Sequence, residues 1–177
     1  MKLEKLNLLD QNEITFVENN YIKSFPVEER RPTDQMFKLY EDYKDKFKIL
    51  LCIKYNERIG FITYWKLNTF TFIEHFAISS VYRQKGYGSK IMQLFIEKIS
   101  QPIVLEVEPP TSHWDIRRIN FYERLGFKLW NEIEYKQPSY HQDGKSYPMK
   151  LMSLREIQLD KKEINVIKLI HSEVYQV

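Results

Sequence analysis

The chain has 177 residues, of which 43% are hydrophobic and 15% aromatic, and its formal net charge is +3. It is too apolar for a disordered protein, it lacks the basic stripe of a nucleic-acid-binding surface, and no segment reaches the roughly 20 apolar residues that cross a membrane. We expect one domain over residues 1–177, with neither a nucleic-acid nor a membrane partner.

Cys52, the only cysteine, lies in an apolar run and is expected to be buried. A lone cysteine without a signal-peptide pattern favours the cytoplasm.

Helical and strand periodicities alternate along the chain. Helices are predicted over residues 11–25, 33–45, 87–99, 112–126 and 160–175, and strands over 3–8, 46–55, 59–67, 70–80, 102–108, 127–136 and 147–155. The expected N-caps are Thr33, Asp160 and either Thr111 or Ser112. This order predicts an α/β fold with one twisted mixed sheet flanked by helices and an extra C-terminal helix. Because one helix-length crossover joins strands 70–80 and 102–108, these two strands should be parallel neighbours.

A glycine-containing loop opens the helix after the third long strand. It combines Gly86 and Gly88 with three cations, Arg83, Lys85 and Lys90. The first N–H groups of a helix lack internal partners and favour an anion, and glycine lets the backbone approach it. The loop therefore predicts a phosphate site, with a tight turn carrying solvated cations as the alternative. It fits neither the Walker nor the dinucleotide-binding spacing.

Two motifs resemble those of the GNAT N-acetyltransferase superfamily. Arg83, Gly86 and Gly88 match its R-x-x-G-x-G signature, and the stretch from Phe121 to Phe127 matches its F-Y-x-x-x-G-F block. The strong resemblance covers residues 72–128, within an acyl-CoA-binding core at about 70–128. It implies a GNAT-like acyl-CoA N-acyltransferase fold, acetyl-CoA as co-substrate, no metal, and a possible homodimer.

The resemblance also implies where the co-substrate binds. The strands at 74–79 and 103–108 should splay apart around the pantetheine arm, and the diphosphate should lie on the glycine loop. The implied binding residues are Phe76, Ala77, Ile78, Arg83, Gln84, Lys85, Gly86, Tyr87, Gly88, Ser89, Asp115 and Tyr122. Asp115 and Arg118 depart from the family, in which asparagine and alanine are common at these places.

Several side chains suit acetyl transfer, which needs a base, an acid and an oxyanion donor. The resemblance makes Tyr122 the acid that protonates the leaving thiolate, with aromatic packing as the alternative. Glu74 is the leading base, with a structural ion pair or a solvated charge as alternatives. His75 should point away from Glu74, because side chains alternate along a strand. It is the second candidate for the base because histidine titrates in a useful range, with a structural role as its alternative.

The acceptor site is less defined. Glu106 and Glu108 share one strand face and suit a cationic amine, and one of them is an alternative to Glu74 as the base. A solvent-facing strand edge is the alternative for both. Glu28, Glu29, Arg30 and Tyr140 are weaker substrate-binding candidates, with a solvated loop as their alternative.

The sequence thus predicts an N-acetyltransferase that moves an acetyl group from acetyl-CoA to a small-molecule or peptide amine by direct transfer in a ternary complex. A non-catalytic acyl-CoA-binding regulatory module is the alternative.

Overall fold

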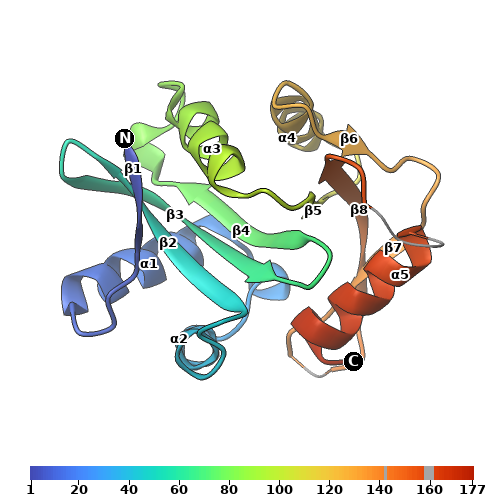
Figure 1. Ribbon diagram of the computed structural model, residues 1–177, viewed down its shortest axis with the longest axis horizontal. Helices are drawn as coiled ribbons and strands as arrows, with labels where there is room; N and C mark the ends of the chain where they lie inside the picture. Colours follow the sequence, from blue (N-terminus) through green and yellow to red (C-terminus); the bar gives the residue numbers. More distant parts are fainter. Residues whose placement is uncertain (142, 158–161) are drawn as a thin grey trace. The chain divides into compact units, whose positions relative to one another are not determined.

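The computed structural model describes residues 1–141, 143–157 and 162–177, and these form two compact units (Figure 1). The first unit comprises Met1–Lys66 and Glu74–Lys98, and the second comprises Leu67–Ile73 and Ile99–Val177. Strand β4, Thr71–Ile78, contributes residues to both units. The expectation of a single domain stays a prediction.

The first unit holds a layer of neighbouring strands with helices on both faces. Its elements are β1 (Lys2–Lys5), α1 (Gln11–Ser24), the 3₁₀ turn η1 (Val27–Glu29), α2 (Thr33–Asp42), β2 (Phe47–Lys54), β3 (Glu57–Lys66), the end of β4, the 3₁₀ turn η2 (Ser80–Tyr82) and α3 (Tyr87–Lys98). β1 and β3 pair antiparallel with β2, and β4 is the next neighbour of β3. These strands agree with the prediction.

Helix packing explains why β3 is apolar on both faces. Tyr21 of α1 contacts Phe61 of β3, with ring centroids 6.0 Å apart. Phe95 of α3 contacts Tyr64 of β3 at 5.0 Å. Because residues 61 and 64 differ in parity, they point to opposite faces of the strand, so the sheet is covered from both sides.

The second helix begins differently from the prediction. Thr33 is its first helical residue, not its cap, and Pro32 precedes it without a side-chain capping bond. Proline suits this position because it fixes φ and the chain then enters the helix. The Thr33 hydroxyl instead donates to Glu18 Oε1 at 2.7 Å.

The second unit contains the first residues of β4, followed by β5 (Ile103–Val107), α4 (His113–Glu123), β6 (Lys128–Leu129), β7 (Tyr135–Pro138), β8 (Ser146–Leu154), α5 (Lys162–Leu169) and a π-helical turn η3 (Ile170–Tyr175). Thr71–Ile73 pair in parallel with Ile103–Leu105, so the parallel-neighbour prediction is confirmed. β8 pairs antiparallel with β5, β6 and β7.

Two predicted elements of this unit need revision. The strand expected over residues 127–136 is divided into β6 and β7, because the polar, exposed pair Asn131–Glu132 forms a turn between them. The C-terminal helix is present from Lys162 but becomes a π-helix at Ile170. The predicted cap Asp160 lies outside the described residues. Within the described residues, no helix is long and apolar enough to cross a membrane.

Candidate functional site

The glycine loop of the first unit runs from η2 into α3. Gln84 and Gly86 adopt left-handed backbone angles, with φ of 62° and 74°. A Cβ built on Gly86 would meet no atom within 4 Å, so the preference for glycine comes from φ, and the space beside the backbone is open. The N–H groups of the first turn of α3, which begins at Tyr87, lack internal partners. The loop therefore has accessible hydrogen-bond donors at a helix N-terminus, where an anion can bind.

Arg83 anchors this loop to two neighbouring elements. Its Nε donates to the carbonyl oxygen of Ile78, at the end of β4, over 2.8 Å. Its Nη2 donates to Ser24 Oγ, at the end of α1, over 3.2 Å. Through these two hydrogen bonds Arg83 fixes the conformation of the loop.

Lys54 joins the loop although sequence reasoning did not include it. Its Nζ donates to the Tyr87 hydroxyl over 2.6 Å and lies 4.6 Å from the ring centroid of Tyr55. The hydrogen bond from Lys54 lowers the pKa of Tyr87. Only the pairing of β2 with β3 brings residue 54 beside the loop, so the local motif carried no signal for it.

Glu74 is an ion-paired carboxylate inside the first unit. Arg31 Nε and Nη2 both lie 2.9 Å from Glu74 Oε1, and the Trp65 indole donates to Oε2 over 3.1 Å. The Glu74 side chain is 1% exposed. Burial alone raises the pKa of Glu74, but the charge of Arg31, the neighbouring His75 and the two hydrogen bonds outweigh it, so the pKa is lowered. These contacts favour the structural ion pair, one of the roles expected for Glu74, over a general base.

The expectation that His75 points away from Glu74 is wrong. His75 Nδ1 lies 3.9 Å from Glu74 Oε2 and 3.0 Å from Thr63 Oγ1. Thr63 contacts His75 and Trp65 contacts Glu74, and Thr63 and Trp65 lie on the same face of β3. Glu74 and His75 therefore point to the same face of the sheet, although they are consecutive, as residues do at a bulge. His75 Nε2 lies 3.0 Å from the carbonyl oxygen of Glu29 and must donate to it. Burial lowers the pKa of His75, so the ring is neutral at pH 7.

The main chain of β4 is accessible at Glu74 and lies close to the neighbouring strand β3 at Ala77. Glu74 as a residue is half-buried although its side chain is 1% exposed, so its accessible surface belongs to the backbone. At Ala77 the neighbouring strand β3 carries Gly60, where a Cβ would lie 2.3 Å from the Ala77 carbonyl oxygen. Glycine at position 60 therefore lets β3 approach β4. Phe76 is half-buried, and Ala77 and Ile78 are buried.

Tyr122 lies on α4 in the second unit, where aromatic rings surround it. Its ring centroid is 5.0 Å from that of Phe121 and 5.5 Å from that of Phe127. Burial raises the pKa of Tyr122 to about 12, although the charge of Arg118 lowers it. The phenol therefore stays protonated at neutral pH and is a hydrogen-bond donor.

Asp115 belongs to the cap of α4. Its Oδ2 accepts from the Ser112 backbone N–H over 2.8 Å and from the Thr111 hydroxyl over 3.1 Å. Its own N–H donates to Ser112 Oγ over 3.2 Å, which completes a capping box. The hydrogen bonds with Ser112 lower the pKa of Asp115. These contacts favour a structural role over the cofactor contact expected for Asp115.

Glu106 of β5 accepts hydrogen bonds from two tyrosine side chains of the second unit. Its Oε2 accepts from the Tyr175 hydroxyl over 2.7 Å, and its Oε1 accepts from the Tyr135 hydroxyl. The Tyr140 hydroxyl lies 3.2 Å from that of Tyr175. Tyr140 was expected in a loop near the acceptor, and the structure places it in this cluster. The tyrosines at 135 and 175 were missed, because they lie 29 and 69 residues from Glu106.

The remaining acceptor candidates differ in their surroundings. Glu108 forms an ion pair with Arg118 of α4, which compensates its charge. Glu28 is exposed on η1, Glu29 uses its carbonyl for His75, and Arg30 Nε donates to the Phe25 carbonyl over 3.2 Å. No described contact brings these residues of the first unit together with one another as a site.

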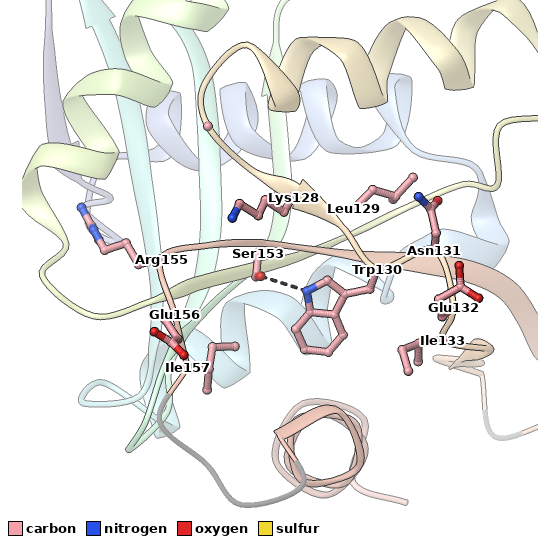
Figure 2. A pocket seen from close by; sticks show the side chains of 11 residues that line it. Lys128, Leu129, Trp130, Asn131, Glu132, Ile133, Ser153, Arg155, Glu156 and Ile157 are labelled. Carbon is pink, nitrogen blue, oxygen red and sulfur yellow. Dashed lines mark hydrogen bonds between the residues drawn. The ribbon is translucent and has the colours of Figure 1, made fainter.

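A hollow of about 780 Å³ lies in the second unit away from the predicted residues (Figure 2). It is lined by Gly126, by β6 and the residues that follow it as far as Ile133, and by Ser153 and Arg155–Ile157. The Trp130 indole donates to Ser153 Oγ over 2.9 Å. Neither the motif residues of the glycine loop nor Tyr122 of α4 line this hollow. Among the described residues, no group of three or more His, Cys, Asp or Glu side chains is arranged to hold a metal ion.

Comparison with known proteins places these motifs in a family. The model of the GNAT acetyltransferase family matches residues 14–127. A protein from Bacteroides thetaiotaomicron assigned to the GNAT acetyltransferases is 34% identical, with a TM-score of 0.92, over 100% of this chain and 99% of that one. An aminoglycoside 6'-N-acetyltransferase complexed with coenzyme A has the same fold at 13% identity and a TM-score of 0.61, over 90% and 98% of the two chains.

The ribosomal-protein-S18-alanine N-acetyltransferase from Escherichia coli also shares the fold. It is 15% identical with a TM-score of 0.59, over 90% of this chain and 98% of that one. No protein of curated function matches the chain.

Proposed function

Since the chain belongs to the GNAT family of acetyltransferases, we propose that it transfers an acetyl group from acetyl-CoA to a primary amine of a small molecule or peptide, directly and in a ternary complex. The observation that carries this proposal is the loop before α3. There the R-x-x-G-x-G residues present a left-handed backbone and unpaired helix N–H groups beside open space.

The residues of the first unit fit the co-substrate. The main chain of Phe76–Ile78 would hold the pantetheine arm, and the backbone from Gln84 to Ser89 would hold the diphosphate. Arg83 keeps the loop in place through Ile78 and Ser24. The side chains of Lys85 and Tyr87 add polar groups at its rim. Asp115 contributes by fixing the start of α4.

Tyr122 supplies the acid in this proposal. Its phenol is protonated at neutral pH and lies beside the rings of Phe121 and Phe127, so it can act as a proton donor to a developing thiolate. The buried pair of Arg31 and Glu74 serves instead to fix β4. The amine must still lose a proton, and the carboxylates of β5 are the remaining candidates.

The fold neighbours guide the choice of acceptors. Two of them are named for N-acetylation of an aminoglycoside and of an alanine of ribosomal protein S18, and both acceptors are amines. We therefore include both chemistries, together with a polyamine, among the acceptors to be tested.

The test mixes full-length protein with acetyl-CoA and, in turn, kanamycin A, spermidine and an alanyl peptide, and follows thiol release. Cys52 is 0% exposed and does not add to the signal. Thiol release with at least one amine supports the proposal. Coenzyme A binding without thiol release points to the regulatory module instead, and absence of both refutes the proposal.

Two variants locate the chemistry. Gly86→Asp should abolish coenzyme A binding, because it crowds the open space and repels the diphosphate. Gly144→Asp is the matched control, since Gly144 also has a left-handed φ of 69° and no atom within 4 Å of a built Cβ. Tyr122→Phe should slow turnover and leave binding nearly unchanged.

A further inference from the structure

The tip of the β2–β3 hairpin lies beside the glycine loop, within the first unit. Lys54 is the last residue of β2, and its Nζ donates to the hydroxyl of Tyr87, the first residue of α3, over 2.6 Å. The same nitrogen lies 4.3 Å from the ring centroid of Tyr87 and 4.6 Å from that of Tyr55. Both distances are within the range of a cation–π contact. The Lys54 ammonium is therefore held at the start of α3 by one hydrogen bond and two aromatic rings.

Tyr55 occupies an unusual place for an aromatic residue. It forms the two-residue turn between β2 and β3 together with Asn56, and their φ values are 48° and 65°. A left-handed backbone is uncommon for a residue of this size, and burial does not offset its cost, because Tyr55 is 87% exposed. Strain of this kind is concentrated at functional sites. The turn brings the exposed ring beside the Lys54 ammonium.

Two further lysines lie around the Tyr87 hydroxyl. Lys85 belongs to the glycine loop and Lys90 to the first turn of α3. The hydrogen bond from Lys54 lowers the pKa of Tyr87, and the charges of all three lysines act in the same direction. Charges have this effect only at short range in a solvated setting. Cations from β2, the loop and α3 thus meet at one helix N-terminus, which favours a phosphate group.

Lys54 is protonated and has donors to offer. Its hydrogen bond to Tyr87, and to a smaller extent the charge of Glu57, raise the pKa of Lys54. The Glu57 carboxylate itself accepts from the Tyr82 hydroxyl over 3.0 Å. An ammonium group has three N–H donors, and among the described residues Lys54 uses one of them, toward Tyr87. The others can bind a further acceptor.

The place of Lys54 selects one group of the co-substrate. On the proposed function, the diphosphate binds the main chain at the start of α3 and the pantetheine arm lies along β4. Coenzyme A carries another phosphate on its ribose, on the side of the diphosphate away from the pantetheine. The Lys54 ammonium lies at the hydroxyl end of the Tyr87 side chain, and hence away from the main-chain donors of the loop.

We propose that Lys54 binds the ribose 3′-phosphate of coenzyme A, and that Tyr55 and Tyr87 are positioning residues that hold its ammonium in place. This inference rests on the proposed function. Lysine suits the role, because it binds phosphate as a compact point charge.

The experiment titrates coenzyme A and 3′-dephospho-coenzyme A into the full-length protein by calorimetry. Wild type is compared with Lys54→Met, Lys54→Arg and the control Lys48→Met. Lys48 is also a half-buried lysine of β2, but it lies at the opposite end of the strand, where its Nζ donates to the Lys44 carbonyl. We expect wild type to bind coenzyme A about tenfold more tightly than the dephospho form, as for a hydrogen bond to a charged group.

The ratio of the two affinities separates the role of Lys54 from a structural one. Lys54→Met should bring the ratio to about one while its affinity for the dephospho form stays that of wild type, which also shows that the variant is folded. Lys54→Arg and Lys48→Met should keep most of the ratio. Tyr87→Phe and Tyr55→Leu should lower it to about threefold, because the ammonium loses a contact and its charge remains.

Three results would overturn the inference. The first is a wild-type ratio in Lys54→Met, and the second is an equal loss of affinity for both ligands in that variant, which would place Lys54 at the diphosphate or in the fold. The third is a wild-type protein that binds both ligands equally well, in which case the proposed function still stands. A wild-type protein that binds neither ligand refutes the proposed function itself, and the role of Lys54 with it.

Discussion

The buried ion pair between Arg31 and Glu74 allows a quantitative prediction. Their side chains are 10% and 1% exposed, so solvent screens the pair little. Arg31→Met removes one partner and leaves a buried carboxylate with the Trp65 indole as a remaining donor. Breaking a buried pair in this way costs about 3–5 kcal/mol, which corresponds to roughly 6–20 °C in Tm for a chain of this size.

The destabilisation caused by Arg31→Met should depend on pH in a defined direction. The native pKa of Glu74 lies below its ordinary value of 4.5, so the pair contributes stability above pH 4.5 that is lost as pH falls through the native pKa. In Arg31→Met the opposing charge is gone, and burial then raises that pKa. The difference in Tm between the two proteins should therefore be largest at pH 7 and smaller at pH 4.

The assay is thermal unfolding followed by circular dichroism at both pH values. Arg30→Met is the matched control, because Arg30 is half-buried and its Nε donates to a backbone carbonyl, that of Phe25, and not to a carboxylate. The double variant Arg31→Met/Glu74→Gln should recover much of the loss, since no buried charge remains. A cost below about 1 kcal/mol for Arg31→Met, the range of surface pairs, would refute the reasoning, as would a difference that does not change with pH.

Three further predictions follow from the packing. Gly60→Ala should lower stability by about 1–3 kcal/mol in urea unfolding, because its Cβ would lie 2.3 Å from the Ala77 carbonyl oxygen; a neutral effect would mean that β3 and β4 separate without cost. Ser112→Ala should cost about 1 kcal/mol in the same measurement, since it removes the cap of α4, and an unchanged midpoint would contradict this. Cys52 is buried and burial raises its pKa, so a thiol reagent should react only after unfolding; rapid reaction of the native protein would disprove the burial.

Much of the first unit could be predicted from local patterns. Alternating apolar residues located β2, β3 and β4, and the spacing of Arg83, Gly86 and Gly88 located the loop, because both signals depend on residues close in sequence. The bulge-like turn of Glu74 and His75 to one face escaped this reasoning. Strand alternation assumes regular pairing, and only the neighbouring strand β3 shows that it is broken here.

The sequence by itself determined most of the order of elements, the position of the glycine loop and the family, since each of these is encoded in short-range spacing. The tertiary structure decided which charges are structural and which are accessible. Arg31 and Glu74 are 43 residues apart, and Tyr175 and Glu106 are 69 apart, so no local pattern connects them. Packing joins such groups because a buried charge is tolerated only where the fold brings it a partner.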